Sequence, residues 1–359
     1  MRRTGNRPGY KLATTTITMD EQKLVISFAL FLLVICLILF FFPFFAVLIP
    51  IVIAIIYHVN QLQRADGATA TSFFNGWIFG GHRGSPYSFP ENSMSGFAQA
   101  QKEGADLIEF DLAMSKDGIA VIMHDDTLDR TTDLSGPVKD KTLGELRAAN
   151  LAAKFARHNS SPVSGSVPRE GVPTLEEVIQ FAVKNNIRML FDVKDYSDEM
   201  VGIIVKAFED YQLYNKAIVC SFYPWVIYKV KRASGGILTG LTWRQHFFAF
   251  SDLDAQVPRY FGLSHYAAQF VDAVYLFMLK TWLPTFLGAD MLLTNEKDIC
   301  PAYVNAMREK GMRVAVWTVN DIVQAQWMMG SLQIPILTDF PYLSKQLGNL
   351  DKFVKNGFK

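Results

Sequence analysis

The chain has 359 residues, of which 50% are apolar and only 19% are charged, and its formal net charge is +1. Such a chain is too apolar to be intrinsically disordered, and it lacks the basic surface through which proteins bind nucleic acid. Its three cysteines are too few for a disulfide framework or a cysteine-rich zinc site.

The apolar residues are concentrated near the N-terminus, where no residue from Leu24 to Tyr57 carries a charge. This run exceeds the ~20 residues that a helix needs to cross a bilayer, and it predicts a membrane anchor over residues 24–58. Pro43 and Pro50 are expected to break or kink it. The run therefore fits either a single span followed by an interfacial stretch or a membrane-embedded hairpin.

Lysine and arginine are more frequent before this run than directly after it. The positive-inside rule then places the N-terminus in the cytoplasm. A single span puts the rest of the chain on the lumenal or extracellular side, whereas a hairpin returns it to the cytoplasm. The triplet Asn159-Ser160-Ser161 is an N-glycosylation sequon with Asn159 as the acceptor, which favours the lumenal side. The sequence does not indicate an organelle.

Beyond the anchor, short β-rich runs alternate with amphipathic helical stretches. Nine strands are expected, at residues 77–81, 106–111, 119–124, 187–193, 217–221, 237–241, 290–294, 313–318 and 335–338. Helices are expected between them, among others at 95–103, 175–184, 197–211, 301–310 and 321–330. This alternation is typical of a parallel α/β sheet, and eight such units close into a (β/α)8 TIM barrel.

One pair of expected strands, 106–111 and 119–124, has no room for a helix between them. A Lys-Asp-Gly turn at residues 116–118 predicts a β-hairpin after the second strand, with one arm outside the barrel. Centring the turn between Lys116 and Asp117 predicts that Glu109 and His124 lie side by side.

Polar side chains gather where the first barrel strands end, the edge at which (β/α)8 barrels build their active sites. They are His82 and Arg83 after the first strand, Glu109 and Asp111 on the second, His124 on the hairpin, and Asp192 and Lys194 on the next strand. Three converging carboxylates repel one another unless a hard cation such as Mg²⁺ or Ca²⁺ neutralises them. The two basic side chains suit a phosphate, and the two histidines suit general acid and base catalysis. Residue chemistry alone thus indicates metal-assisted cleavage of a phosphate ester.

Each of these residues also has a structural interpretation. A histidine at a strand end is commonly a satisfied core residue, and alternating acidic residues commonly mark the solvent face of a strand. Two further motifs, Pro90-Glu91-Asn92 and Arg130-Thr131-Thr132, are interpreted as caps of helices or turns. Thr174 and Glu177 form a capping box and are taken as structural.

The order of short motifs over roughly residues 77–345 resembles the glycerophosphodiester phosphodiesterases, and most closely their animal membrane-anchored members. The motifs are His82-Arg83-Gly84, Pro90-Glu91-Asn92, Gly104-Ala105-Asp106, Glu109 with Asp111, Lys116-Asp117-Gly118, His124-Asp125, Arg130-Thr131-Thr132, Pro173 to Glu177, and Trp317-Thr318-Val319-Asn320. The resemblance implies a TIM barrel of the phospholipase C-like phosphodiesterase type.

The resemblance also implies residue roles. His82 and His124 match the catalytic histidines, Glu109 and Asp111 the metal ligands, and Arg83 the phosphate-contacting arginine. The family's third metal carboxylate is usually the Glu of a Glu-x-Lys motif. Here Asp192 stands in that place, with Lys194 following as a phosphate-binding residue, and a water can bridge the shorter side chain to the ion.

The implied reaction is metal-dependent hydrolysis of glycerophosphodiesters to glycerol 3-phosphate and an alcohol, with Mg²⁺ as the main expectation and Ca²⁺ as the alternative. Expected substrates are glycerophosphoinositol, glycerophosphoethanolamine and its N-acyl forms. An alternative is a lysophospholipase D or cyclising lyase activity on lysolipids at the same site. A non-catalytic membrane scaffold or receptor is a second class, disfavoured because both histidines and all three carboxylates are present.

A second apolar segment, residues 243–287, is expected as an insertion in the barrel. It contains Phe247, Phe248 and Phe250, followed by residues rich in Phe, Leu, Tyr and Met. Either it is a long barrel helix facing the core, or it lies on a membrane beside the barrel mouth and gives lipid-like substrates a route to the site. In the second case, polarising the three phenylalanines should reduce activity on acylated substrates more than on soluble ones.

The expected partners are therefore a small-molecule diester or lysolipid and membrane lipid, with no nucleic acid. The predicted organisation in chain order is an N-terminal tail (1–23), the anchor (24–58), a linker (59–76), the catalytic barrel with its insertion (77–345) and a C-terminal tail (346–359).

Overall fold

The computed structural model describes residues 19–41 and 43–348, and the chain divides into two units between Asn60 and Gln61. The first unit contains helices α1 (Met19–Phe41) and α2 (Pro43–Asn60). Helix α1 ends at Phe41 and α2 begins at Pro43, and Pro50 lies within α2. Residues 1–18 of the predicted tail and residues 349–359 lie outside the described residues, and α1 already begins at Met19.

Within residues 19–41 and 43–348, we find no helix that combines the length and the apolarity needed to cross a membrane.

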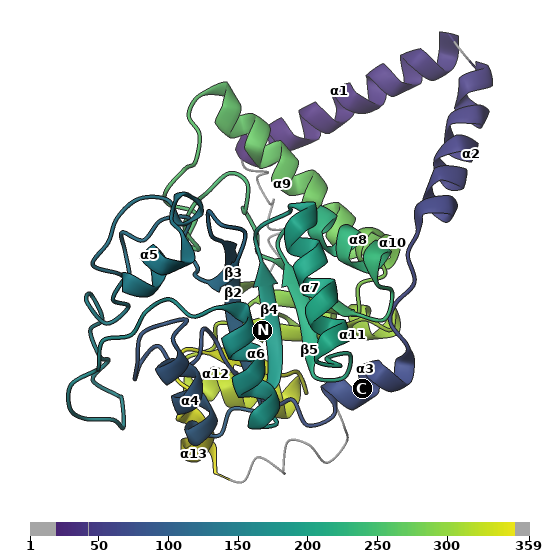
Figure 1. Cartoon of the computed structure of the whole chain (residues 1–359). Coiled ribbons are helices and arrows are strands. Elements are labelled where there is room, and N and C mark those ends of the chain that lie inside the picture. Colours follow the sequence, from purple (N-terminus) through teal and green to yellow (C-terminus); the bar gives the residue numbers. More distant parts are fainter. Residues whose placement is uncertain (1–18, 42, 349–359) are drawn as a thin grey trace, which may run out of the picture. The chain divides into compact units, whose positions relative to one another are not determined.

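The second unit is a closed barrel of eight parallel strands (Figure 1). The strands are β1 (Phe79–Gly81), β2 (Leu107–Met114), β4 (Arg188–Val193), β5 (Ala217–Ser221), β6 (Leu238–Trp243), β7 (Met291–Asn295), β8 (Arg313–Trp317) and β9 (Ile336–Thr338). Closure comes from β1, which pairs in parallel with β2 on one side and with β9 on the other. The predicted (β/α)8 barrel is confirmed.

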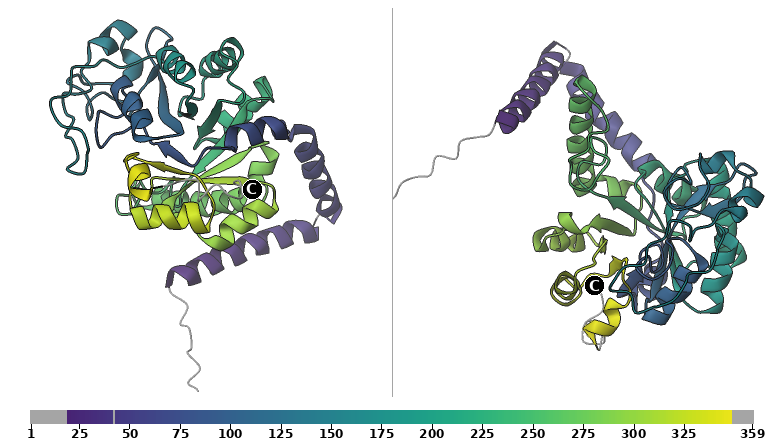
Figure 2. Two further views of the ribbon diagram at one scale, coloured as in Figure 1. Left: turned by 90° about the horizontal axis from the view of Figure 1, so that it is seen from below. Right: turned by 90° about the vertical axis from the view of Figure 1, so that its left-hand side faces the viewer.

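Helices surround the strands, as the two further views in Figure 2 show. They are α4 (Met94–Glu103), α6 (Leu175–Lys184), α7 (Asp198–Asp210), α8 (Pro224–Ala233), α9 (Leu263–Thr281), α10 (Leu283–Phe286), α11 (Pro301–Glu309), α12 (Ile322–Gln326) and α13 (Leu343–Leu347). The helix expected at 321–330 is α12 continued by a π-helical turn, Trp327–Ser331. A short helix, α5 (Leu143–Ala148), follows the hairpin.

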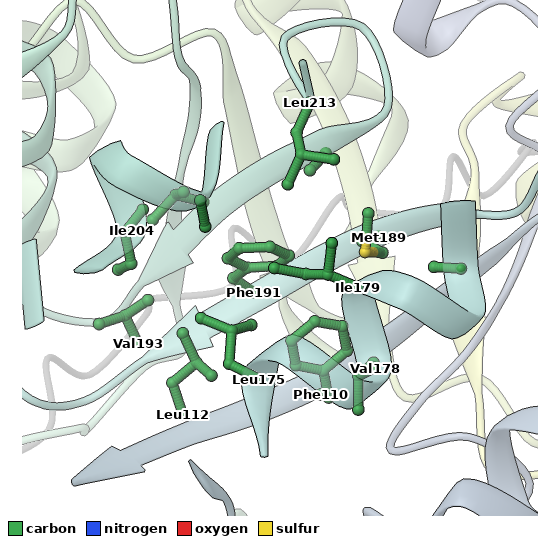
Figure 3. Packing of buried hydrophobic residues seen from close by; sticks show 14 of the residues in the cluster. Phe110, Leu112, Leu175, Val178, Ile179, Met189, Phe191, Val193, Ile204 and Leu213 are labelled. Carbon is green, nitrogen blue, oxygen red and sulfur yellow. The ribbon is translucent and has the colours of Figure 1, made fainter. Parts of the chain in front are cut away.

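Strand β2 has two buried faces, because successive side chains of a strand point in opposite directions. Its outward residues, such as Phe110 and Leu112, pack with Phe191 of β4 and with apolar residues of α6 and α7 (Figure 3). Its inward residues are Leu107, which belongs to the core inside the barrel, and then Glu109 and Asp111. The alternating acidic residues therefore face the barrel interior and not solvent.

The segment predicted as the linker, residues 59–76, is partly helical. It contains helix α3 (Gly67–Phe74), whose N-terminus is capped by the Asp66 carboxylate. Phe73 and Phe74 of α3 are buried in the same cluster as the barrel-interior residue Leu107, at the start of β2. Helix α3 thus covers the end of the barrel opposite the strand carboxyl ends. Its sequence, Gly-Ala-Thr-Ala-Thr-Ser-Phe-Phe, has weak helical propensity and only two large apolar residues, so it gives no clear helical pattern.

The predicted hairpin is present, and its second arm, β3 (Ala120–Ile122), pairs antiparallel with β2 outside the ring of eight. The register is shifted by one residue from the prediction, because Met114 lies opposite Ala120 and the turn is centred on Asp117. Gly118 adopts a φ of 76°, which closes a three-residue loop with a left-handed residue. Continued by two residues, this register sets His124 across from Phe110, so the predicted pairing of His124 with Glu109 is wrong. The His124 Nε2 lies 4.0 Å from Asp111 Oδ1.

Candidate active site

The carboxyl ends of the barrel strands surround a cavity of about 680 Å³, which we call the catalytic cavity. All seven residues predicted for the site line it, namely His82, Arg83, Glu109, Asp111, His124, Asp192 and Lys194. They come from β1, β2, the hairpin and β4, which stand next to one another in the barrel. The fold therefore brings together every predicted catalytic, metal-binding and phosphate-binding residue.

Three carboxylates lie at the floor of the catalytic cavity. Asp111 of β2 lies opposite Asp192 of β4 in the parallel register, and Glu109 is two residues earlier on the same face of β2. All three side chains are buried, with 2% to 7% of their surface exposed. Uncompensated negative charge at such a depth is costly, so the groups around each carboxylate decide its ionisation.

The three carboxylates differ in how far nearby positive charges offset the cost of burying their negative charge. Burial, together with the neighbouring acidic groups, raises the pKa of Glu109 to about 8 and that of Asp192 to about 6. Burial also acts to raise the pKa of Asp111, but the positive charges of Lys194 and Arg83 outweigh it and hold that pKa well below its usual range. The Lys194 Nζ lies 3.0 Å from Asp111 Oδ1.

The described residues contain no group of three His, Cys, Asp or Glu side chains arranged as a ready metal site. The chemistry of the floor nevertheless suits a hard cation. The Asp192 Oδ1 atom is buried without a hydrogen-bond partner, and the available ligands are all carboxylate oxygens. Mg²⁺ and Ca²⁺ prefer this type of ligand.

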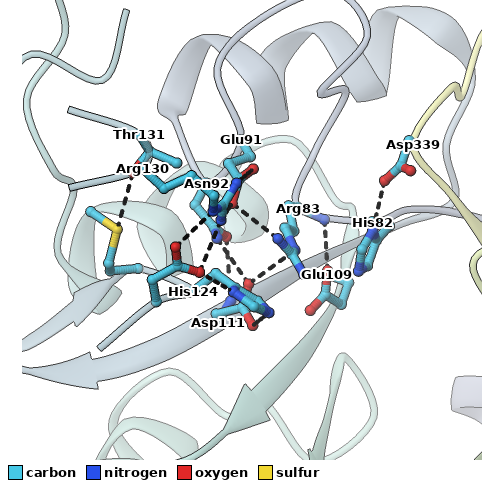
Figure 4. Close-up of polar contacts among 12 residues, drawn as sticks. His82, Arg83, Glu91, Asn92, Glu109, Asp111, His124, Arg130, Thr131 and Asp339 are labelled. Carbon is cyan, nitrogen blue, oxygen red and sulfur yellow. Dashed lines mark hydrogen bonds and ion pairs between the residues drawn. The ribbon is translucent and has the colours of Figure 1, made fainter. Parts of the chain in front are cut away.

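Arg83 connects the floor to the rim (Figure 4). It has a φ of 52°, a left-handed conformation, and its backbone N–H donates to Glu109 Oε2 at 2.6 Å. Its guanidinium donates to Glu91 at 3.0 Å, and its Nε lies 3.5 Å from Asp111 Oδ2. The next residue, Gly84, also has a positive φ, 89°, and a Cβ there would approach the Gly96 backbone to 2.8 Å. The backbone after β1 is thus held so that Arg83 faces both acidic residues of β2.

Two motifs that the sequence left as caps support the site. Glu91 accepts two hydrogen bonds from Arg130, at 2.7 and 2.8 Å, in addition to the one from Arg83. The Asn92 amide donates to Asp111 Oδ2 at 2.9 Å. The turn-capping interpretation holds for Thr132, which accepts from the backbone N–H of Leu134, but it leaves out the contacts of Glu91, Asn92 and Arg130. Nothing in their local sequence indicates that Asn92 reaches Asp111, 19 residues away, or that Arg130 reaches Glu91, 39 residues away.

His124 is oriented by an acidic neighbour. Its Nδ1 lies 2.6 Å from Asp125 Oδ1, and Arg130 also bonds to that carboxylate. Its Nε2 lies 4.0 Å from Asp111 Oδ1, and its backbone carbonyl accepts from Lys194. Burial lowers the pKa of His124 more than the nearby carboxylates raise it.

His82 has a corresponding partner that the sequence did not indicate. Its Nδ1 lies 2.7 Å from Asp339 Oδ1, and Asn320 donates to the other oxygen of that carboxylate at 2.7 Å. Asp339 directly follows β9, and closure of the barrel by β1 and β9 brings the two residues together. Burial acts to lower the pKa of His82, but the Asp339 and Glu109 carboxylates outweigh it and raise that pKa above its usual value.

We expect Asp339→Asn to reduce kcat by about 10²-fold, because the amide can no longer fix the tautomer of His82 and stabilise its protonated form. The substitution should also lower the pKa of His82, since the carboxylate raises that pKa while burial lowers it. An NMR titration of the His82 imidazole in the wild type and the variant measures this directly. A pKa that stays the same or rises would contradict the assigned role of Asp339.

The three phenylalanines of the insertion are half-buried and do not form an exposed patch. The Phe247 ring lines the catalytic cavity and stacks on Phe222 at 4.8 Å between centroids. Phe248 packs edge-on against Tyr275 of α9, and Phe250 packs edge-on against His265. Large exposed apolar side chains of the insertion lie instead on α9 and just before it.

Asn159, the predicted glycosylation acceptor, is exposed in a turn. Its glycosylation stays a prediction.

Comparison with known proteins identifies relatives over most of the second unit. A family model described as the glycerophosphoryl diester phosphodiesterase family matches residues 82–343. Glycerophosphodiester phosphodiesterase 1 of Homo sapiens is 33% identical over 260 residues, which cover 72% of this chain and 76% of the human protein. The protein of that name from Mus musculus is 34% identical over 264 residues, with the same shares covered.

Solved structures show the same fold. A phosphodiesterase from Oleispira antarctica, in complex with the product sn-glycerol-3-phosphate, aligns with a TM-score of 0.58 and 21% identity, covering 77% of this chain and 98% of that chain. A glycerophosphodiester phosphodiesterase from Thermotoga maritima aligns with a TM-score of 0.53 and 21% identity, covering 76% of this chain and 98% of that chain.

Proposed function

Because the chain belongs to the glycerophosphoryl diester phosphodiesterase family and is a phosphoric diester hydrolase, we propose that the catalytic cavity hydrolyses glycerophosphoinositol, glycerophosphoethanolamine and N-acyl glycerophosphoethanolamines. The products are glycerol 3-phosphate and the corresponding alcohol. The observation that carries this proposal is the pair His82 and His124, each with an acidic partner on Nδ1, beside a buried carboxylate floor in one cavity.

In the proposed mechanism, His82 and His124 transfer protons on opposite sides of the phosphorus atom. Each imidazole uses Nδ1 for its acidic partner, Asp339 or Asp125, which leaves Nε2 for the reacting atoms. One histidine takes the proton of the attacking hydroxyl or water, and the other protonates the leaving oxygen. If the neighbouring glycerol hydroxyl attacks first, the two exchange roles when water opens the cyclic phosphate.

Arg83 and Lys194 bind the phosphate in this proposal. Both side chains line the cavity and carry positive charge beside Asp111. An arginine can hold two phosphate oxygens in a fork, and a lysine adds a point charge.

The cation site of the proposal consists of Glu109, Asp111 and Asp192, with Mg²⁺ or Ca²⁺ as the ion. A bound divalent cation would neutralise these carboxylates and stabilise the charge that develops on the phosphate oxygens. The unpartnered Oδ1 of Asp192 and the raised pKa of Glu109 support this assignment.

The test of function is turnover by the purified full chain, followed by ³¹P NMR, on glycerophosphoinositol, glycerophosphoethanolamine and a lysolipid, each with Mg²⁺, Ca²⁺ or a chelator. We expect glycerol 3-phosphate from the glycerophosphodiesters and loss of turnover with chelator. Accumulation of a cyclic phosphate would favour the cyclising lyase, and release of lysophosphatidate or its cyclic form from the lysolipid would favour the lysophospholipase D alternative. Absence of turnover on every diester would contradict the proposal.

We also propose that the enzyme works at a membrane, to which α1 and α2 attach it. Large apolar side chains are exposed along both helices, for example Phe28 (61%), Phe40 (80%) and Ile53 (59%). Apolar surface of this extent is stabilised by contact with acyl chains and is rare on proteins surrounded by water alone. Protease protection in sealed vesicles separates a lumenal catalytic unit from a cytoplasmic one.

The insertion offers the catalytic unit a second membrane contact, because α9 carries an apolar stripe. Its exposed residues recur three or four positions apart and so share one helix face: Leu263, Tyr266, Phe270, Val274 and Phe277. Asp272, the acidic residue of α9, is buried and accepts hydrogen bonds from the backbone of Phe248 and Ala249. Leu253 of the same insertion, ten residues before the first residue of the stripe, lines the catalytic cavity. We propose that α9 lies on the bilayer and that acylated diesters reach the cavity along it.

The variant Phe270→Gln/Phe277→Gln should lower kcat/KM for an N-acyl glycerophosphoethanolamine in bilayers by about tenfold, while changing turnover of glycerophosphoinositol less than twofold. A tenfold loss corresponds to about 1.4 kcal/mol. This is less than the ~3–6 kcal/mol for full burial of two large side chains, because side chains on a bilayer surface are buried only in part. Val323→Gln, which removes an exposed apolar residue on α12, is the matched control. Equal losses on both substrates would contradict the membrane contact, as would energy transfer between labelled copies that shows α9 pairing with a second chain.

A further inference from the structure

The wall of the catalytic cavity across from His82 carries two arginines. In the ring of eight strands, β6 stands opposite β1, so the segment after β6 faces the catalytic histidine across the cavity. Arg244 directly follows β6, and Arg259 lies between β6 and α9. Both line the cavity, yet neither forms an ion pair with a carboxylate among the described residues.

Arg259 is held in place while its terminal nitrogens stay available. Its Nε donates to the backbone carbonyls of Phe247, at 3.2 Å, and Phe250, at 3.0 Å. Its guanidinium carbon lies 5.8 Å from the centre of the Phe247 ring. Within the described part of the chain, its two terminal nitrogens have no hydrogen-bond partner. A guanidinium anchored through Nε still presents one outward N–H on each terminal nitrogen, and these two parallel donors form the fork that binds a carboxylate or a phosphate.

Arg244 adds a second positive charge near that of Arg259. It is buried, and its nitrogens donate to the backbone carbonyls of Gln245, at 3.2 Å, and Phe250, at 2.8 Å. Its guanidinium carbon lies 5.7 Å from the Phe247 ring that Arg259 also contacts. Burial, followed by the charge of Arg259, lowers the pKa of Arg244, which agrees with two cations close together.

The carboxylates nearest to this pair are occupied by backbone amides. Asp252 accepts from the N–H groups of Gln256 and Val257, Asp298 accepts from Gln245, and Asp272 accepts from the turn that contains Phe248. These hydrogen bonds hold the backbone of the insertion in place. None of the three carboxylates forms a direct ion pair with Arg244 or Arg259.

From this arrangement we infer that Arg244 and Arg259 form a subsite for an anionic group on the alcohol half of the diester. The inference rests on the proposed function. The glycerol half carries no charged group besides the phosphate, so an anion that reaches this wall belongs to the alcohol, as a carboxylate or as a second phosphate. A cavity of about 680 Å³ falls within the range that holds a complete small ligand.

The test uses diesters that differ by one anionic group. Glycerophosphoserine is glycerophosphoethanolamine with an added carboxylate, and a phosphorylated glycerophosphoinositol is compared with glycerophosphoinositol in the same way. For each pair we take the kcat/KM of the anionic substrate divided by the kcat/KM of its matched substrate. Arg259→Gln should reduce this ratio by about tenfold or more, mainly by raising the KM of the anionic substrate. Arg259→Lys should restore part of the ratio. Arg232→Gln, which replaces an exposed arginine of α8 outside the cavity, should leave the ratio unchanged.

A reduced ratio in either pair supports the subsite and identifies the anion that it prefers. Equal losses on both members of each pair would mean that Arg259 only holds its segment in place, which would overturn the inference. The affinities of O-phosphoserine and phosphoethanolamine, measured by calorimetry on the full chain, give the same comparison without turnover. If the wild type is inactive, the proposed function is contradicted. The ratio of these two affinities still shows whether Arg259 binds the added anionic group.

Discussion

Replacing either His82 or His124 with alanine should reduce kcat/KM for glycerophosphodiesters by about 10²- to 10⁴-fold, the usual contribution of a positioned general acid or base. Both imidazoles line the catalytic cavity and have Nδ1 bound to a carboxylate. Because the two act on the same transition state, the double variant should lose much less than the product of the two single losses.

The control for this experiment is His158→Ala, which removes an exposed histidine outside the catalytic cavity and should keep wild-type turnover. Thermal unfolding of each variant separates a catalytic effect from a loss of structure. Retention of more than a tenth of the wild-type kcat/KM by His82→Ala or His124→Ala would remove that residue from the mechanism.

Asp111→Asn should reduce turnover by about 10³-fold and abolish tight Mg²⁺ binding, since the loss of several kcal/mol of charge stabilisation corresponds to that factor. It should also destabilise the metal-free protein by about 3 kcal/mol, because it leaves the cations of Lys194 and Arg83 without their buried partner. Asp192→Asn should weaken Mg²⁺ binding as well, but without destabilising the metal-free protein, because Asp192 Oδ1 has no partner to lose.

Calorimetric titration with Mg²⁺ and chemical denaturation in chelator measure these two quantities independently of activity. The opposite order of stabilities, with Asp192→Asn the less stable variant, would contradict the charge assignment of the cavity floor. Unchanged Mg²⁺ affinity in both variants would contradict the cation site itself.

The sequence was sufficient for the barrel and for most of the floor because both depend on local pattern. The strand around Phe110 has apolar residues on both faces apart from two acidic ones, which is unusual for a strand and therefore informative. Placing Glu109 and Asp111 at a strand carboxyl end already implied a common cavity with Asp192. The parallel register that sets Asp111 opposite Asp192 confirms this prediction.

Features that depend on the closing of the fold could not be predicted. Asp339 reaches His82 only because the last strand pairs with the first, across more than 250 residues of sequence. The hairpin register depends on the turn, in which Gly118 takes a left-handed conformation, and it differs by one residue from the register that would pair His124 with Glu109. Helix α3 has too few apolar residues for a periodic signal, although Phe73 and Phe74 are fully engaged in the core.

In the insertion, amino-acid composition alone does not show which apolar side chains are buried and which are exposed. Of the two interpretations of the insertion, the membrane one assigned substrate access to Phe247, Phe248 and Phe250, but their rings pack on Phe222, Tyr275 and His265. The exposed apolar face belongs to α9, where residues with the same composition recur at helical spacing. Only the packing partners, which come from distant strands and loops, distinguish the two cases.

The most direct test of the central claim is hydrolysis of glycerophosphoinositol in H₂¹⁸O by the wild type and by His124→Ala, followed by ³¹P NMR and mass spectrometry. The site described above predicts glycerol 3-phosphate with one ¹⁸O on phosphorus from the wild type, and almost no product from the variant over the same time. Label in the released alcohol, or equal rates for the two proteins, would contradict it.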